Sequence, residues 1–217
     1  MEFIYLHGFA SSPGSKKAVA FKKAFNKEGA SLIVPDLQDG NFEGLTISSQ
    51  IEVVEKILDQ IDAGQVGMIG SSMGGYLAAL LAQRRNEVAG LYLMAPGFDF
   101  LARWQRTLLE KYSHPSKIPP LIEVYHYGYD KNVFLDTDIF QDAEKWEQVN
   151  LDRKLPVRIV HGTLDESVDI GISEEFVRAR PWSQLIKLES DHGLISHIKW
   201  LVTDCLDFFN KIRQTNK

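Results

Sequence analysis

The most informative part of the chain is the stretch QVGMIGSSMGGYLAALLA, residues 65–82. Its apolar start, residues 65–69, predicts a short buried strand, and its alanine- and leucine-rich end predicts a helix. Between the two, Gly70, Ser72 and Gly74 form a Gly-x-Ser-x-Gly motif in a strand, turn and helix context. The turn strains the backbone of its central residue, so small residues are needed two positions away on either side. We therefore expect the Ser72 hydroxyl to project above the edge of a sheet.

A Gly-x-Ser-x-Gly motif also occurs in ordinary loops of small residues, so its meaning depends on the residues downstream of it. Later in the chain, residues 155–160 and 184–188 each predict a strand. Asp165 comes after the first of these strands, and His192 comes after the second. In open α/β sheets, functional residues gather at the carboxyl ends of the strands. The order Ser72, Asp165, His192 therefore predicts a nucleophile, an acid and a base that meet at one sheet edge.

The loop after the first strand is the candidate source of a second oxyanion donor. Residues 2–6 predict a strand, and a His-Gly pair comes directly after it. The glycine lets the backbone turn so that the next N–H group faces a bound molecule. We expect the backbone amides of Phe9 and Met73 to form an oxyanion hole. His7 is expected to brace this loop by hydrogen bonding, because one base suffices and His192 is better placed for that role.

Four segments spread over nearly the whole chain resemble the small serine esterases of the α/β-hydrolase superfamily, and in particular the compact bacterial YqiA/YcfP-type esterases. These segments are YLHGF (5–9), GSSMGG (70–75), HGTLD (161–165) and SDHG (190–193). The resemblance implies one α/β-hydrolase domain over residues 1–217. It also favours Asp165 as the acid over three rivals: Glu166 and Asp169, which are near it, and Asp191, which is beside His192. The first strand already carries the His-Gly loop, so the two antiparallel leading strands of larger relatives are expected to be absent.

The composition is that of a globular protein and narrows the classes of function. A hydrophobic content of 44% in 217 residues is enough to bury a substantial core. The formal net charge of −5 argues against general nucleic-acid binding. Apolar runs are too short for a membrane span, and the first strand begins directly after Met1, so we expect a cytoplasmic protein. The single cysteine, Cys205, excludes an internal disulfide and is expected in a helix core.

Strands and helices alternate along the chain, which predicts a mostly parallel central sheet with helices on both faces. Strands are predicted at residues 2–6, 30–34, 65–69, 88–94, 155–160 and 184–188. Helices are predicted at residues 16–26, 47–61, 76–82 and 195–212, and Thr46 is a candidate cap for the second of them.

Residues 98–150 break the alternation and are rich in aromatic side chains. They predict a helix at 100–112, a hairpin of residues 121–127 and 131–135, and a second helix at 138–149. In the family that the chain resembles, an insertion at this point is a lid over the site. We expect its aromatics to form an apolar acyl or aryl pocket, although they could instead only pack the insertion onto the sheet.

These observations favour a serine hydrolase that cleaves a small-molecule carboxylic ester or thioester through an acyl-enzyme intermediate. No set of histidines has metal-ligand spacing, and no glycine-rich phosphate loop is present, so no metal or cofactor is expected. The alternative is a catalytically silent binding protein on the same fold, because fold alone does not determine function. The natural substrate and the oligomeric state are left open by the sequence.

Overall fold

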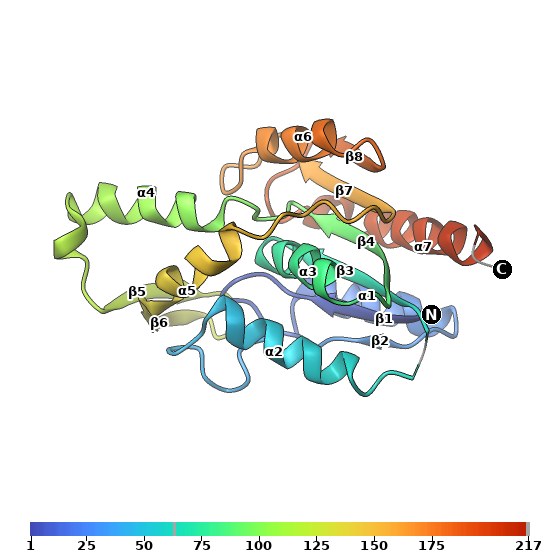
Figure 1. Cartoon of the computed structure of the whole chain (residues 1–217), viewed down its shortest axis with the longest axis horizontal. Coiled ribbons are helices and arrows are strands. Elements are labelled where there is room, and N and C mark those ends of the chain that lie inside the picture. Colours follow the sequence, from blue (N-terminus) through green and yellow to red (C-terminus); the bar gives the residue numbers. More distant parts are fainter. Residues whose placement is uncertain (63, 216–217) are drawn as a thin grey trace.

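The protein is built on a six-stranded sheet that has helices packed on both of its faces (Figure 1). The computed structural model describes residues 1–62 and 64–215. The strands follow the order β2-β1-β3-β4-β7-β8 across the sheet, and all of their pairings are parallel. They are β1 (Glu2–Leu6), β2 (Leu32–Ile33), β3 (Val66–Ser71), β4 (Val88–Met94), β7 (Val157–Gly162) and β8 (Ser183–Leu188). The predicted parallel sheet is thus confirmed.

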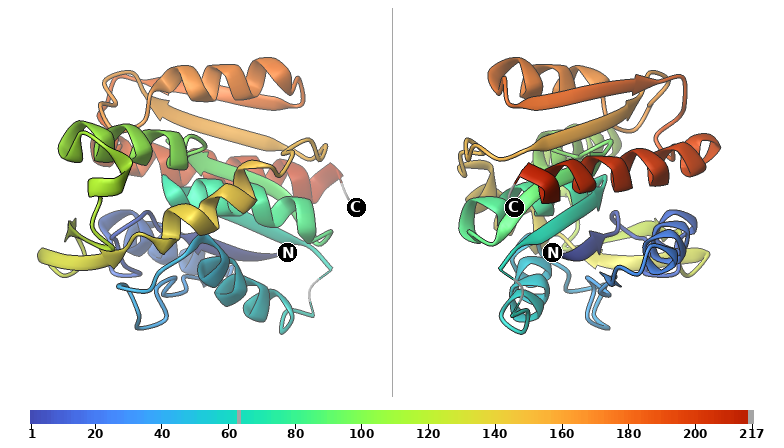
Figure 2. Two further views of the ribbon diagram at one scale, coloured as in Figure 1. Left: turned by 60° about the vertical axis from the view of Figure 1, so that its left-hand side comes forward. Right: turned by 90° about the vertical axis from the view of Figure 1, so that its right-hand side faces the viewer.

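Two apolar cores lie on opposite faces of this sheet, and each is covered by its own helices (Figure 2). One core lies under α1 (Lys16–Lys27) and α7 (Ile198–Thr215), and the other under α2 (Ile47–Leu58), α3 (Met73–Arg84) and α6 (Ile170–Ala179). In β1, Phe3 and Tyr5 enter the first core, while Ile4 and Leu6 enter the second. This alternation follows from the two-residue period of a strand. Cys205 is buried in α7, as predicted.

Several elements differ in extent from their predictions; α3, for example, spans Met73–Arg84 where residues 76–82 predict a helix. The strand predicted at residues 30–34 shortens to β2, which is an edge strand that pairs only with β1 and is followed closely by Pro35. A proline has no N–H group for a sheet ladder, so it ends the pairing early. The strand predicted at 155–160 begins only after Pro156, for the same reason. The helix predicted at 195–212 starts with a 3₁₀ turn, η2 (Ile195–His197), before α7 begins.

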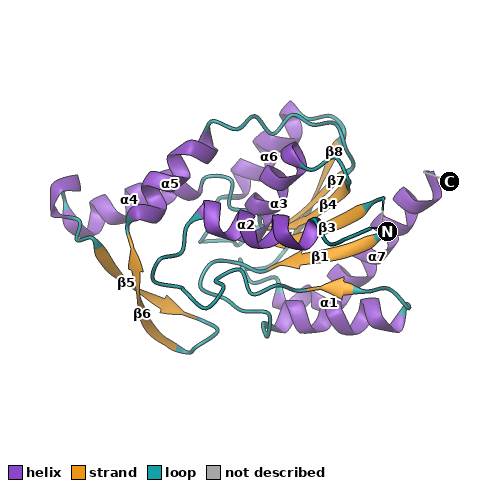
Figure 3. Ribbon diagram, turned by 60° about the horizontal axis from the view of Figure 1, so that its bottom comes forward, coloured by secondary structure: helices purple, strands orange, loops and turns teal. Residues whose placement is uncertain are grey.

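Residues 98–150 extend beyond the carboxyl ends of the strands (Figure 3). They form α4 (Phe100–Tyr112), η1 (Pro115–Lys117), β5 (Leu121–His126), β6 (Lys131–Asp136) and α5 (Asp138–Glu147). β5 and β6 make an antiparallel hairpin that is separate from the main sheet, as predicted. A buried polar contact ties this segment to α2, because the Asp142 carboxylate accepts hydrogen bonds from the Ser48 amide and hydroxyl at 2.8 and 2.6 Å.

The turn between β3 and α3 is packed so closely that glycine is needed on both sides of Ser72. The φ angle of Ser72 is 53°, in the left-handed region that side chains rarely adopt. A Cβ atom on Gly70 would lie 2.4 Å from the Gly74 carbonyl oxygen. A Cβ atom on Gly74 would lie 2.1 Å from the Leu6 carbonyl oxygen, in the neighbouring strand β1. These contacts are with backbone atoms, which cannot move aside without shifting the strands.

We expect Gly74→Ala to lower the free energy of unfolding by about 1–3 kcal/mol, the usual cost of overpacking a tight site. Urea denaturation measures this change. Gly64→Ala is the matched control, because a Cβ atom there would meet nothing within 4 Å. Its effect should stay within about 0.5 kcal/mol. Equal stabilities of the two variants would contradict the close packing of the turn.

Candidate active site

The structure brings the three residues of the predicted site together at the carboxyl end of the sheet. Ser72 lies between β3 and α3, Asp165 in the loop after β7, and His192 in the loop after β8. The His192 Nε2 atom lies 3.0 Å from the Ser72 hydroxyl oxygen. The His192 Nδ1 atom lies 2.7 Å from the Asp165 Oδ2 atom. Since a carboxylate only accepts, the proton of this second hydrogen bond belongs to Nδ1, which leaves Nε2 free to accept from the serine.

The Asp165 carboxylate is fully buried and is held by four hydrogen-bond donors. The backbone amides of Ser167 and Val168 donate to Oδ1 at 2.8 and 2.9 Å. The Nε2 atom of His161 lies 3.1 Å from Oδ2, to which His192 also donates. Burial by itself raises the pKa of Asp165, but the hydrogen bonds from His161, His192 and Val168 outweigh it and hold that pKa well below its usual range. Asp165 is therefore an anion at neutral pH.

His161 is the member of this cluster to which the sequence assigned no role. It lies in β7 with no exposed side-chain surface. Its Nδ1 atom accepts from the Ser173 hydroxyl at 2.8 Å, and its Nε2 atom faces both Asp165 and the Val168 carbonyl. The imidazole therefore helps to orient the carboxylate together with His192. The sequence signal that could have revealed this contact is the position of His161 in the segment HGTLD, four residues before Asp165.

Two of the three rival carboxylates accept hydrogen bonds elsewhere, and the third is exposed to solvent. Asp191 Oδ1 accepts from the Leu194 amide at 3.1 Å. Asp169 caps the N-terminus of α6 by accepting from the Gly171 amide at 2.8 Å. Glu166 is exposed. Among the residues that the structure describes, Asp165 alone places a carboxylate within hydrogen-bond distance of His192.

The two amides expected to form an oxyanion hole both border Ser72. Met73 comes directly after it as the first residue of α3, where backbone N–H groups have no partner inside the helix. Phe9 comes after Gly8, and a Cβ atom on Gly8 would lie 3.4 Å from the Ser72 Cβ atom. Within the described part of the chain, neither the Phe9 amide nor the Met73 amide donates a hydrogen bond to another residue. A bound oxyanion would therefore displace no hydrogen bond at either amide.

The loop that carries Phe9 is held from two sides. His7 is buried, and its Nδ1 atom donates to the Gly8 carbonyl at 3.0 Å while its Nε2 atom accepts from the Leu37 amide at 3.3 Å. Burial lowers the pKa of His7, which keeps the ring neutral in this bracing position. From the other side, the Tyr127 amide of the 98–150 segment donates to the Ala10 carbonyl at 2.8 Å. The insertion therefore contacts the loop beside the expected oxyanion hole directly.

A cleft of about 1010 Å³ opens beside Ser72 and His192. Phe9, Trp104 and Tyr127 supply aromatic surface to it. Polar groups lie between these aromatics: serines from the loop after β1, the basic side chains Lys16, Lys17 and Arg103, and Asp191. The cleft is therefore mixed, with apolar surface as its larger part, and the apolar acyl or aryl pocket stays a prediction.

Most aromatics of the 98–150 segment pack against the rest of the protein and do not reach the cleft. Phe98 stacks on Phe176 of α6 with ring centroids 4.5 Å apart. Phe100 and Phe140 stack at 6.3 Å and join the core on the α2–α3 face. Both interpretations of the aromatic run were partly correct, because two of its members line the cleft and others anchor the segment.

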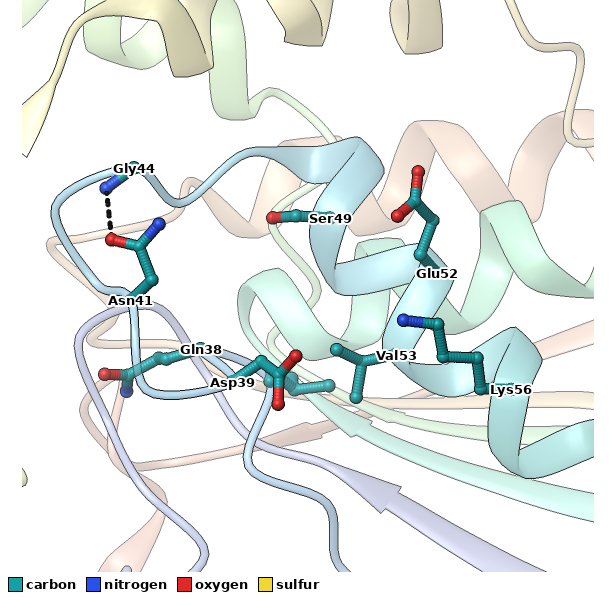
Figure 4. Close-up of a pocket in the computed structure, with 9 residues that line it drawn as sticks. Gln38, Asp39, Asn41, Gly44, Ser49, Glu52, Val53 and Lys56 are labelled. Atoms are coloured by element: carbon teal, nitrogen blue, oxygen red, sulfur yellow. Dashed lines mark hydrogen bonds between the residues drawn. The ribbon is translucent and has the colours of Figure 1, made fainter.

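A second, smaller hollow of about 140 Å³ lies between α2 and the loop before it (Figure 4). Asn41 Oδ1 accepts from the Gly44 amide there at 3.1 Å, and Glu52 and Lys56 reach it from α2. It contains no residue of the predicted site. Over residues 1–62 and 64–215, no cluster of three histidine, cysteine or acidic side chains could hold a metal ion. No helix in that part of the chain has the length and apolarity to cross a membrane.

Several known proteins are similar to this chain in sequence or in structure. A bovine palmitoyl-protein thioesterase, ABHD10, described as mitochondrial, is 24% identical over 96% of this chain and 74% of its own length. The structure of Est1E from Butyrivibrio proteoclasticus matches with a TM-score of 0.79 and 21% identity, over 98% of this chain and 88% of Est1E. Mouse α/β-hydrolase domain-containing protein 10 matches with a TM-score of 0.77 and 23% identity, over 97% and 90% of the two chains.

The arrangement of strands, helices and turn is therefore the α/β-hydrolase fold. Within that class, the chain belongs to the uncharacterised protein family UPF0227, whose model matches residues 2–209. This membership confirms the resemblance that the four sequence segments indicate.

Proposed function

We propose that this protein is a serine hydrolase that cleaves carboxylic esters or thioesters, with Ser72, His192 and Asp165 as its catalytic residues. The observation that carries the proposal is a chain of two hydrogen bonds. The Ser72 hydroxyl lies 3.0 Å from His192 Nε2, and His192 Nδ1 lies 2.7 Å from the Asp165 carboxylate. The whole of residues 1–217 serves as one catalytic domain in this proposal. The thioesterase name of the bovine relative supports the reaction class. A cytoplasmic location stays a prediction.

In the acylation step, His192 Nε2 accepts the Ser72 proton while the serine oxygen attacks the acyl carbon. The carbonyl π electrons move to oxygen, and the amides of Phe9 and Met73 stabilise that oxyanion, at roughly 3 kcal/mol per donor. The carbonyl then re-forms, and the bond to the alcohol or thiol breaks. His192 gives its proton to the departing oxygen or sulfur, so the products are an acyl-serine and the free alcohol or thiol.

In the deacylation step, His192 takes a proton from water, and the hydroxide oxygen attacks the acyl-serine carbon. Collapse of the second oxyanion breaks the bond to Ser72, which recovers its proton from His192. Asp165 stays ionised in both steps because its pKa is held well below the usual range. Its role is to fix the His192 tautomer and to stabilise the imidazolium that forms.

We also propose that residues 98–150 act as a lid that sets acyl selectivity. Trp104 of α4 and Tyr127 of the hairpin end both line the cleft, on elements that lie beyond the sheet. Trp104 also packs edge-on against Phe9, with ring centroids 5.5 Å apart. Tyr127 is 76% exposed, so its side chain can change without loss of core packing.

Trp104→Ala and Tyr127→Ala are expected to change the ratio of kcat/KM between short and long acyl esters. A methylene group in an apolar pocket is worth about 1–3 kcal/mol, so we expect graded shifts of about tenfold or more. A series of 4-nitrophenyl esters of increasing chain length measures the ratio. Phe134→Ala, an exposed aromatic outside the cleft, is the control. An unchanged chain-length profile in both cleft variants would contradict the lid proposal.

Turnover of a panel of acyl esters and acyl thioesters tests the proposed function itself. Hydrolysis of at least one member, with release of one acid for each alcohol or thiol, is expected. A folded protein that turns over no member of the panel, and whose Ser72 does not react with an organophosphonate, would instead support a binding protein on the same fold.

A further inference from the structure

Three basic side chains line the cleft that contains Ser72 and His192. Lys16 and Lys17 begin helix α1, and Arg103 comes from α4 of the 98–150 segment, so positive charge approaches the cleft from two separate elements. Asp191 is the one acidic residue among those lining it. The chain as a whole has a formal net charge of −5. The cleft lining therefore carries an excess of positive charge, opposite in sign to the net charge of the whole protein.

Lys17 is half-buried and lacks a close counter-charge. Within the described residues, no carboxylate oxygen lies within 4.0 Å of its ammonium nitrogen. Burial lowers the pKa of Lys17 to about 8, although the more distant charges of Asp191 and Asp165 oppose that shift. Burying an ammonium group without a partner costs free energy. A bound anion in the cleft would supply the missing partner.

Arg103 is anchored by one of its guanidinium nitrogens. Its Nη1 atom donates to the Ser167 carbonyl at 2.8 Å, next to the loop that holds Asp165. Its Nη2 atom lies 3.5 Å from the position of a Cβ atom on Gly97, and that same position is 3.6 Å from the Met73 amide nitrogen. The Nη2 atom is therefore at most about 7 Å from the Met73 amide nitrogen, so this guanidinium group lies close to the expected oxyanion hole. Across the described part of the chain it has no carboxylate partner within 4.0 Å.

We propose that the substrate carries an anionic group, a carboxylate or a phosphate, and that Lys17 and Arg103 bind it while its ester or thioester lies at Ser72. Ammonium and guanidinium groups are the side chains that bind such oxyanions through charge-assisted hydrogen bonds. The N-terminal end of α1 and the nearby Ser12 and Ser15 add polar surface along the same wall. This inference rests on the proposed function, but anion binding can be measured without turnover.

Two matched substrate pairs test the preference. The first is 4-acetoxybenzoate against its methyl ester, which differ by one carboxylate charge. The second is acetyl-coenzyme A against S-acetyl-N-acetylcysteamine. Both contain the acetyl thioester, but only acetyl-coenzyme A carries phosphate groups. We expect kcat/KM to favour the charged member of at least one pair by about tenfold or more, as a charged hydrogen bond contributes. The pair that shows the effect identifies carboxylate or phosphate as the preferred anion.

Charge-neutralising variants assign the preference to its residues. Lys17→Gln and Arg103→Gln should each reduce the ratio between charged and neutral substrates about tenfold, whereas Lys17→Arg should retain it. Lys23→Gln is the matched control, because Lys23 lies exposed on the same helix and outside the cleft. Equal kcat/KM values for both members of both pairs would overturn the proposal. A preference that survives in both Lys17→Gln and Arg103→Gln would also overturn it.

The pH dependence gives a signature that a merely structural lysine would lack. Since the pKa of Lys17 is lowered to about 8, its charge is present below that pH and is lost as the pH rises through it. The preference for the charged substrate should therefore fall above about pH 8 in the wild-type protein. It should persist in Lys17→Arg, because arginine stays protonated. Asp191, Asp165, Lys16 and Arg103 also face this region, and the Lys17→Arg comparison holds all of them constant.

Equilibrium binding separates failure of this inference from failure of the proposed function. In the Ser72→Ala protein, calorimetry should show 4-hydroxybenzoate binding at least about tenfold more tightly than its uncharged methyl ester. Tighter binding of the anion, lost in the Ser72→Ala, Lys17→Gln double variant, would support the cationic site even if no ester were hydrolysed. Equal or weaker binding of the anion would overturn the inference even if hydrolysis were observed.

Discussion

Ser72→Ala is expected to reduce kcat/KM for any ester that the protein cleaves by at least about a thousandfold. The Ser72 oxygen lies 3.0 Å from His192 Nε2 and sits on a turn that directs it above the sheet edge. Alanine removes the only atom that the proposed mechanism uses to form the acyl-enzyme. Steady-state kinetics on one 4-nitrophenyl ester measures the loss. Unchanged thermal unfolding would show that the variant remains folded.

Ser71→Ala is the matched control for this experiment. Ser71 is the last residue of β3 and immediately precedes Ser72, but its hydroxyl makes no hydrogen bond to His192. We expect this variant to keep most of its activity. Near-normal turnover in Ser72→Ala combined with loss in Ser71→Ala would show that the nucleophile is misassigned.

Asp165→Asn is expected to lower kcat by up to about four orders of magnitude without unfolding the protein. The two carboxylate oxygens of Asp165 now accept from the side chains of His192 and His161 and from the backbone amides of Ser167 and Val168. Asparagine would leave only one oxygen to accept from these donors. An amide N–H facing His192 Nδ1 would favour the tautomer that protonates Nε2. That tautomer cannot accept the serine proton. Pre-steady-state kinetics should locate the loss in acylation.

Asp169→Asn provides the control for the acid. Asp169 is close in the sequence but caps α6, and asparagine is an equally good helix cap. Its activity should stay close to that of the wild-type protein. If Asp169→Asn or Asp191→Asn removed activity while Asp165→Asn retained it, the acid would be a different residue from the one proposed.

The parts of the structure that could be predicted are those that local sequence specifies. The turn at Ser72 needs glycine at two positions, which is visible in the sequence, and the structure shows backbone contacts of 2.4 and 2.1 Å for the corresponding Cβ atoms. Asp165 and His192 could be chosen because each comes shortly after an apolar strand. In a parallel sheet such strand ends necessarily meet at one edge.

Features that depend on packing between distant segments could not be predicted. His161 is oriented toward Asp165 by Ser173 of α6, which contacts its other ring nitrogen, and in the sequence it resembles one more residue of a buried strand. Lys17 and Arg103 line the same cleft only because α4, which carries Arg103, lies near the start of α1. The polar and charged groups in the cleft were missed for the same reason, because they come from the loop after β1, from α1 and from α4.

The central claim is that Ser72 is a nucleophile activated by His192. Intact-protein mass spectrometry after incubation with a small fluorophosphonate tests it most directly, because the reagent needs an activated serine but no particular acyl group. We predict one adduct per chain, which peptide mapping places on Ser72 and which is absent from Ser72→Ala and strongly reduced in His192→Ala. A folded wild-type protein that gains no adduct, or that carries it on another residue, would contradict the account.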